Sequence, residues 1–217
     1  MDNNNVQDMY NIMESIGLYS LVNGNQRSTL YGLAWFNAQY RDTAIYIDVG
    51  TYNGCSAIVM ASALKHQKLS IPQKVYTVDN YNYDNYFFSH YSYDHIYYSK
   101  QAIIEKIKDN FSHFCIDDII EFHVEDDIEF IQSLPDHSID MVFDDSGHNY
   151  EHTLNRLRNY IPKMNDNSLI VCHDYYVDGY SVIKAIKDFE KEFPHIVTNY
   201  GVIEGMYCGI CNLTIRT

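Results

Sequence analysis

Residues 44–57 read Ala-Ile-Tyr-Ile-Asp-Val-Gly-Thr-Tyr-Asn-Gly-Cys-Ser-Ala, and this stretch decides the fold that the sequence predicts. It opens with a short apolar run, which is typical of a buried strand. Gly50 and Gly54 follow with three residues between them, and an apolar helical pattern begins at Ile58. Strand, glycine turn and helix together form the first unit of a doubly wound α/β fold. Gly50 lets the backbone turn sharply and lets a ligand approach closely, because glycine has no Cβ.

The turn does not suit a dinucleotide. A dinucleotide-binding turn reads Gly-x-Gly-x-x-Gly, and Tyr52 stands where the middle glycine would lie against the pyrophosphate. Asp48, at the end of the strand, would repel a pyrophosphate and suits a ligand with a positive amino group. S-adenosylmethionine has such an amino group and no phosphate. The alternative at this point is an ordinary strand–turn–helix whose glycines serve geometry alone.

The segment Asp48-Val49-Gly50-Thr51-Tyr52-Asn53-Gly54 resembles motif I of the class I S-adenosylmethionine-dependent methyltransferases, in which an acidic residue precedes a glycine turn. The resemblance implies cofactor contacts for five of these residues: Asp48, Gly50, Tyr52, Asn53 and Gly54.

Composition narrows the class of protein. The 217 residues are 46% hydrophobic and 20% charged, which suits one globular α/β domain. The net charge of −14 disfavours nucleic acid as a partner, because binding it requires a basic surface. No signal peptide or membrane span is recognisable, and the five unevenly spaced cysteines are typical of free thiols. We therefore expect a cytoplasmic protein that acts on a small molecule, with no nucleic acid or membrane partner.

The rest of the chain alternates between helical and strand patterns. Strands are predicted at residues 44–48, 74–79, 119–124, 138–143, 167–172, 196–203 and 207–215, and helices at 6–18, 27–40, 99–114, 150–161 and 180–192, besides one after Gly54 and a short one ending at Leu134. This order matches the methyltransferase sheet. The predicted fold class is α/β: a Rossmann-like, seven-stranded, mostly parallel sheet with an antiparallel C-terminal hairpin and helices on both faces. Residues 1–43 would add helices to a cofactor-binding domain at 44–217, within a single domain overall.

Acidic residues at further strand ends are candidate cofactor ligands. Asp79 closes the second strand at a spacing that suits binding of ribose hydroxyls, and Asn80 follows it. In the family, an acid after the third strand meets the adenine amino group, and Asp126 with Asp127 stands there. Asp144, at the end of the fourth strand, would lie beside the methyl donor. The alternatives are a turn cap at Asp79 and a helix N-cap at Asp126 or Asp127.

Two segments leave their roles open. Residues 80–98 are rich in tyrosine and follow neither a helical nor a strand period, so they suit a lid over the substrate, a contact between copies of the chain, or a plain loop. Cys208-Gly-Ile-Cys211 is a single C-x-x-C inside a predicted strand, which disfavours a redox or zinc role.

Acids and imidazoles gather after the fourth and fifth strands. These residues are Asp144, Asp145, His148, His173 and Asp174. Because the carboxyl ends of adjacent parallel strands meet at one edge of a sheet, the side chains should lie close together. Carboxylates suit Mg²⁺, whereas imidazole shifts the preference toward a transition metal. The sequence therefore predicts a site for Mg²⁺ or another divalent cation.

Asp145-Ser-Gly-His-Asn-Tyr-Glu151, followed by Leu-Ile-Val-Cys-His173-Asp174-Tyr175, resembles the methyltransferase group that includes metal-dependent sugar O-methyltransferases and cephalosporin-hydroxylase-like proteins. The resemblance implies that Asp145 and Asp174 bind the metal, and it places His173 where some members have another metal-ligand Asp. Gly147 departs from the pattern, because the sugar methyltransferases have there an Asp proposed as general base. His148 is the remaining candidate, since imidazole titrates near neutral pH.

The sequence thus predicts an S-adenosylmethionine-dependent methyltransferase that methylates a hydroxyl of a sugar or natural product, assisted by a divalent cation. His148 and His173 are the candidate catalytic residues, and Asp145, His173 and Asp174 the candidate metal ligands. The alternatives are a helix cap at His148 and a core histidine at His173. At the level of the whole protein, the alternative is a binding or regulatory protein that keeps the fold without turnover.

Overall fold

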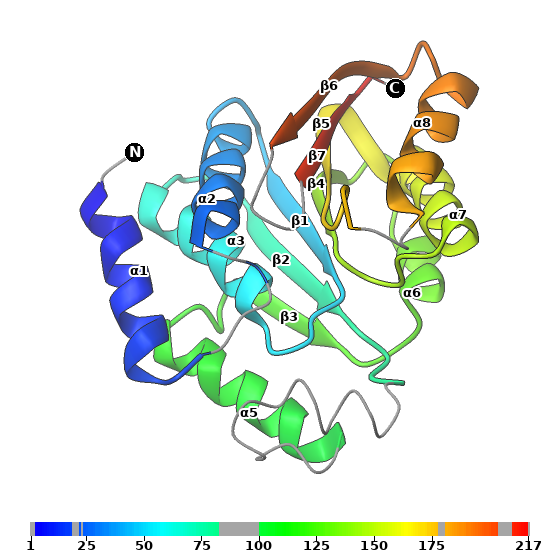
Figure 1. Ribbon diagram of the computed structural model, residues 1–217. Coiled ribbons are helices and arrows are strands. Elements are labelled where there is room, and N and C mark those ends of the chain that lie inside the picture. Colours follow the sequence, from blue (N-terminus) through cyan, green and yellow to red (C-terminus); the bar gives the residue numbers. More distant parts are fainter. Residues whose placement is uncertain are drawn as a thin grey trace.

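Seven strands form one sheet in the order β3-β2-β1-β4-β5-β7-β6 in the computed structural model (Figure 1). The structure describes residues 3–18, 22, 24–82, 100–177, 181–203 and 210–216. The strands are β1 (Ala44–Val49), β2 (Gln73–Val78), β3 (Ile120–His123), β4 (Ile139–Asp144), β5 (Met164–Cys172), β6 (Val197–Ile203) and β7 (Ile210–Ile215). β1 to β5 pair in parallel, and β7 runs antiparallel to both β5 and β6. The predicted fold class is confirmed.

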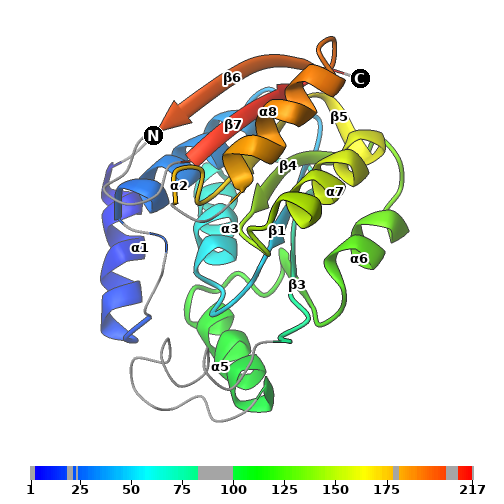
Figure 2. The same cartoon turned by 45° about the vertical axis from the view of Figure 1, so that its right-hand side comes forward.

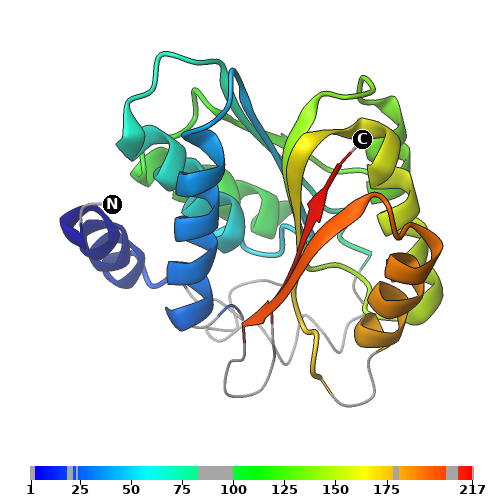
Figure 3. The ribbon, with the colours of Figure 1, turned by 90° about the horizontal axis from the view of Figure 1, so that it is seen from above.

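Helices cover both faces of the sheet, as the view from above shows (Figure 3). One face carries α1 (Asn3–Ser15), α2 (Gly24–Ala38), α3 (Cys55–Gln67) and α5 (Lys100–His113). The other carries α6 (Asp127–Ser133), α7 (Tyr150–Tyr160) and α8 (Val182–Glu192), and a 3-10 turn at Ile161–Lys163 follows α7. Figure 2 shows α7 and α8 packed side by side. We refer to the two faces as the α3 face and the α7 face.

The strands are apolar on both faces because the sheet is buried between these layers. Side chains alternate along a strand, so Tyr46 of β1 packs on the α3 face whereas Ile47 packs on the α7 face. By the same alternation Met141 and Phe143 of β4 face α3 and Val142 faces α7. This parity decides where the acidic residues at the strand ends point.

The N-terminal helices complete the core on the α3 face. Met9 and Met13 of α1, with Leu30, Tyr31 and Ala34 of α2, are buried in the same cluster as α3. The division of the chain at residue 43 stays a prediction. No helix in the described part of the chain is both long enough and apolar enough to cross a membrane.

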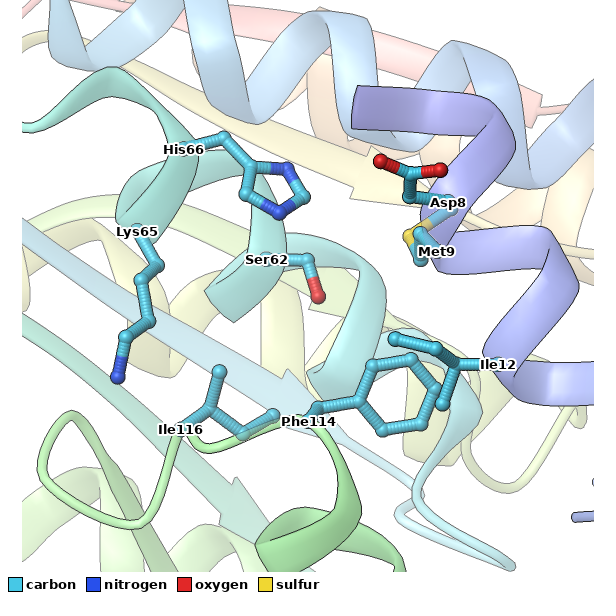
Figure 4. Close-up of a pocket in the computed structure, with 8 residues that line it drawn as sticks. All are labelled: Asp8, Met9, Ile12, Ser62, Lys65, His66, Phe114 and Ile116. Atoms are coloured by element: carbon cyan, nitrogen blue, oxygen red, sulfur yellow. The ribbon is translucent and has the colours of Figure 1, made fainter. Parts of the chain in front are cut away.

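A cavity of about 50 Å³ lies between α1, α3 and the segment after α5 (Figure 4). Asp8, Lys65, His66 and Phe114 are among its lining residues. It is far smaller than the roughly 300 Å³ at which ligand pockets begin. The helix α3 begins at the carboxyl edge of the sheet and runs away from it. Lys65 and His66, near its C-terminal end, therefore lie away from the strand ends that carry the candidate site.

Candidate active site

The carboxyl ends of four strands meet at one edge of the sheet. Val49 of β1 is paired with Val78 of β2 on one side and with Asp144 of β4 on the other, and Asp144 is paired with Cys172 of β5. The residues that follow these strands therefore lie side by side, as predicted from the sequence. In open α/β sheets this edge is where ligands bind.

The glycine turn after β1 packs directly against the end of β4. Gly50 has a φ of 96°, and a Cβ built on it would lie 2.3 Å from the carbonyl oxygen of Asp145. The amide of Gly50 donates to the carbonyl of Val78 (3.0 Å), and the amide of Asp145 donates to that of Val49 (2.8 Å). A glycine is thus needed at residue 50 for two reasons: the positive φ of the turn and the close approach of the Asp145 carbonyl. A second packing contact fixes Gly54, whose Cβ would lie 2.9 Å from the ring of Phe111.

Asp48 is fully buried on the α3 face. Its Oδ2 accepts from the hydroxyl of Thr77 (2.6 Å), which also lies 2.6 Å from the hydroxyl of Thr51. Its Oδ1 has no hydrogen-bond partner among the residues that the structure describes. Burial raises the pKa of Asp48 to about 7, the hydroxyls of Ser56 and Thr77 lower it, and the charge of Asp145 raises it further. A positive charge brought to this edge would stabilise the ionised form.

Asp79 joins the turns that follow β1 and β2. Its Oδ2 accepts from the amide of Tyr52 (3.0 Å) and its Oδ1 from the amide of Tyr81 (2.8 Å). The hydroxyl of Tyr81 donates to the carbonyl of Tyr52 (2.9 Å), which closes the link. Each carboxylate oxygen can accept a second hydrogen bond, so the turn contacts and the predicted ribose contacts are compatible. Sequence reasoning missed Tyr81 because it begins the tyrosine-rich segment.

Two asparagines of the predicted cofactor set bond within their own turns. Oδ1 of Asn53 lies 3.4 Å from the amide of Cys55, at the start of α3. Oδ1 of Asn80 accepts from the amide of Asn82 (2.9 Å). Both side chains therefore shape the turns beside the glycine segment.

Asp126 and Asp127 have different partners at the start of α6. Oδ1 of Asp126 accepts from the amides of Ile128 (3.0 Å) and Glu129 (3.1 Å), so the N-cap alternative holds for Asp126. Oδ2 of Asp127 accepts from the hydroxyl of Ser146 (3.3 Å). Burial raises the pKa of Asp127, although the charge of Arg156 lowers it.

Asp144 faces α7, and its contacts differ from the predicted role. Both of its oxygens accept from the guanidinium of Arg156 at 2.8–3.2 Å, and Oδ2 also accepts from the hydroxyl of Tyr160 (2.8 Å). These bonds use the acceptor positions of the carboxylate. These contacts argue against the cofactor contact predicted at Asp144, because alternation turns its side chain into the α7 face. Arg156 and Tyr160 are spaced i, i+4 on an amphipathic helix, a signal that both share one face.

Asp145, His148 and Asp174 form a group that could hold a cation. One ligand atom from each lies within 4.8 Å of the others, and all three side chains are half-buried. Nε2 of His148 lies 3.4 Å from Oδ2 of Asp174 and 4.0 Å from Oδ1 of Asp145. Two carboxylates and one imidazole are a donor set that suits a divalent transition metal as well as Mg²⁺.

His173 lies behind this group and is not part of it. Its side chain is buried, and its Nδ1 lies 3.0 Å from Oδ1 of both Asp145 and Asp174. This geometry favours His148 as the third member of the group, and the ligand role predicted for His173 stays a prediction. Alternation turns His173 toward the α3 face, where its ring lies 6.0 Å from that of Phe143.

Several expectations lie outside the described residues. They include the lid or subunit contact predicted for residues 80–98, of which the structure describes 80–82, and the C-x-x-C motif at Cys208. Of the described cysteines, Cys55 and Cys172 are buried and Cys115 is exposed.

Comparisons with known proteins place the fold in context. A family profile described as "Methyltransferase domain" matches residues 47–175, which is more than half of the chain. The O-methyltransferase TomG from Streptomyces achromogenes, solved with S-adenosylmethionine, is 14% identical and covers 100% of this chain and 92% of its own, with a TM-score of 0.65. An O-methyltransferase from Bacillus cereus, solved with S-adenosylhomocysteine, is 13% identical. The match covers 100% of this chain and 92% of that one, with a TM-score of 0.66. A putative caffeoyl-CoA O-methyltransferase from Staphylococcus aureus is 15% identical. The match covers 98% of this chain and 92% of that one, with a TM-score of 0.62. No curated protein matches the chain. Identities this low show a shared fold alone.

Proposed function

This chain belongs to the methyltransferase-domain family, and we propose that it transfers a methyl group from S-adenosylmethionine to a hydroxyl oxygen of a small molecule, such as a sugar or another natural product. The observation that carries the proposal is the contact between Gly50 and the carbonyl of Asp145, which sets the glycine turn beside the candidate cation group. Methyl donor and acceptor hydroxyl would then lie next to each other. Two similar structures are described as O-methyltransferases in complex with S-adenosylmethionine or S-adenosylhomocysteine, which supports the same reaction.

The cofactor would bind across the ends of β1, β2 and β3. In this proposal the turn from Gly50 to Gly54 carries the amino-acid end, and the buried Asp48 supplies the negative charge beneath its amino group. Asp79 and Asn80 would receive the ribose, and Oδ2 of Asp126, which the helix cap leaves unused, would receive the adenine amino group. Asp144 would not contact the cofactor, because Arg156 and Tyr160 donate to its carboxylate.

The cation would be held by Asp145, His148 and Asp174, with His173 behind the two carboxylates. A bound divalent cation lowers the pKa of a neighbouring hydroxyl, and S-adenosylmethionine supplies the methyl as a sulfonium. The oxygen forms its bond to the methyl carbon while the carbon–sulfur bond breaks, and the electron pair stays on sulfur. With His148 bound to the cation, the hydroxyl proton passes to water. If Asp145 and Asp174 alone hold the cation, His148 can accept this proton.

Gly147 stands where the sugar methyltransferases have an Asp, which favours the alternative of a binding protein without turnover. A Cβ at this position would lie 3.2 Å from Nδ1 of His152 and 3.4 Å from Nη1 of Arg156. The carboxylate that the sugar methyltransferases have here is absent, and the tight surroundings leave little room for one. Membership in that sugar subgroup stays a prediction. We also propose a cytoplasmic setting, which the five unevenly spaced cysteines of the sequence favour.

Transfer of radiolabelled methyl from S-adenosylmethionine to a panel of sugars and phenols tests the proposal, in Mn²⁺, in Mg²⁺ and in EDTA. We expect incorporation that EDTA abolishes and Mn²⁺ restores. Binding of S-adenosylhomocysteine without incorporation into any acceptor would favour the non-catalytic alternative. Incorporation that EDTA leaves unchanged would remove the cation from the reaction.

A further inference from the structure

The loop of residues 145–148, between β4 and α7, carries two of the three residues of the candidate cation group. Its carbonyl groups are bonded from outside the loop. The guanidinium of Arg156 donates to the carbonyls of Ser146 and Gly147, the latter at 3.2 Å. The hydroxyl of Thr153 also lies 3.4 Å from the carbonyl of Gly147. Both donors come from α7, so the helix fixes the path of the loop.

The far end of the loop has a third anchor. The amide of Ser181, the residue before α8, donates to the carbonyl of His148 (3.0 Å). His148 is thus fixed relative to α8 and Ser146 relative to α7.

The guanidinium of Arg156 is itself held in one orientation. It is 2% exposed, and Asp144 accepts from both its Nε and its Nη2. Tyr160 holds the same carboxylate from the next turn of α7. Such a forked pair sets direction as well as charge, and a lysine ammonium cannot reproduce it. One rigid side chain therefore connects the end of β4 with the loop that follows it.

The backbone at Gly147 also packs against the guanidinium of Arg156. The φ of Gly147 is 31°, and a Cβ there would lie 3.4 Å from Nη1 of Arg156. The guanidinium donates to the carbonyl of Gly147 (3.2 Å) as well as to that of Ser146. The glycine and the buried arginine thus belong to one packing arrangement.

We propose that Arg156 is the positioning residue of the cation site: it touches neither cation nor substrate, and it holds the backbone of Ser146 and Gly147 so that Asp145 and His148 converge with Asp174. The inference rests on the cation site of the proposed function. Residues that orient metal ligands from behind commonly change metal affinity by about 10-fold to 100-fold when they are replaced.

Arg156→Lys tests the proposal in the full-length protein. It keeps a positive charge beside Asp144 and removes the fork that reaches the two carbonyls. Mn²⁺ binding is measured by electron paramagnetic resonance and S-adenosylhomocysteine binding by calorimetry. We expect Mn²⁺ affinity to fall by about 10-fold or more, while S-adenosylhomocysteine affinity changes less than 2-fold. Arg158→Lys is the matched control on the same helix, because Arg158 is exposed and pairs with Glu192 on the surface; it should leave both affinities unchanged.

Thr153 supplies a second pair of variants that leaves the buried charges intact. Thr153→Val removes the hydroxyl near the carbonyl of Gly147, and Thr153→Ser keeps it. We expect Thr153→Val to weaken Mn²⁺ binding by a few-fold and Thr153→Ser to restore it. If Arg156→Lys fails to fold, this pair decides the question.

The outcomes separate the two proposals. Wild-type protein that binds no Mn²⁺ would refute the cation site and the positioning role together. Wild-type protein that binds Mn²⁺, with folded Arg156→Lys and Thr153→Val variants that bind it equally well, would refute the positioning role alone.

Discussion

Asp48 and Asp144 lie at the ends of adjacent strands of one sheet, and they differ in how their carboxylates are hydrogen-bonded. Asp144 faces α7, where Arg156 and Tyr160 satisfy both of its oxygens. Asp48 faces α3, where Thr77 satisfies one oxygen and the other has no hydrogen-bond partner among the described residues. Both carboxylates are buried. A satisfied buried carboxylate holds the fold together, whereas an incompletely satisfied one keeps capacity for a ligand.

Charge distinguishes the two faces as well. Arg156 gives the α7 face a permanent cation beside Asp144, and although burial opposes its charge, the charge of Asp144 raises the pKa of Arg156. On the α3 face Asp48 has neighbouring carboxylates at Asp145 and Asp79, which raise its pKa in addition to burial. A cationic ligand at the carboxyl edge would give Asp48 a positive neighbour, as Arg156 is to Asp144.

Replacing Asp144 should have the largest effect. Asp144→Ala leaves Arg156 as a buried charge without its main partner, which typically costs about 3–5 kcal/mol. Urea unfolding of the variant should show this loss in the free energy of unfolding. Glu192→Ala, which breaks the exposed pair with Arg158, serves as the control, because exposed pairs contribute about 1 kcal/mol or less. A loss at Asp144 no larger than at Glu192 would contradict the structural role of this carboxylate.

Gly50 lies in the turn between Asp48 and the backbone of Asp145, and adding a methyl group there should destabilise the fold nearly as much. A Cβ would collide with the backbone carbonyl of Asp145, and the φ of 96° is itself unfavourable for any side chain. We expect Gly50→Ala to destabilise the fold by about 3 kcal/mol, at the upper end of the cost of overpacking. Gly32→Ala is the control, since a Cβ there meets nothing within 4 Å. Equal unfolding free energies for the two variants would show that the turn can move away from Asp145.

The sequence predicted the sheet well because apolar runs and glycine turns are local signals. It also predicted that acids from β1, β2, β4 and β5 share one edge. It could not assign Asp144, because strands buried on both faces give no alternation from which the direction of a side chain could be read. The sequence also could not tell which of His148 and His173 lies with the two carboxylates at the surface. His148 lies in a loop that Arg156 contacts, and strand parity turns His173 inward.

Titration of Asp48 should change stability by an intermediate amount. Its folded-state pKa of about 7 lies above the ordinary value of 3.8, so the unfolded chain releases this proton at lower pH than the folded protein does. The contribution of Asp48 to the free energy of unfolding therefore falls progressively as pH rises from about 4 to 7, by up to roughly 1.4 kcal/mol per pH unit.

Asp48→Asn removes this titration. Between pH 5 and pH 8 the wild type should lose about 2–3 kcal/mol relative to the variant, as measured by urea unfolding at each pH. Parallel pH profiles for the two proteins would show that Asp48 is ionised throughout this range.

Asp79→Ala should have the smallest effect on the fold and a distinct effect on binding. Oxygens of Asp79 bond to the amides of Tyr52 and Tyr81, and the variant loses both bonds together with the proposed ribose contacts. We expect S-adenosylhomocysteine affinity to fall by about 10-fold, which corresponds to roughly 1.4 kcal/mol, the range of one hydrogen bond to a charged group. Calorimetry measures this directly, and Mn²⁺ affinity should stay unchanged because Asp79 is not a member of the cation group. If the variant bound S-adenosylhomocysteine as tightly as the wild type, Asp79 would serve the two turns alone. The α3 face would then resemble the α7 face, with its carboxylates committed to the fold.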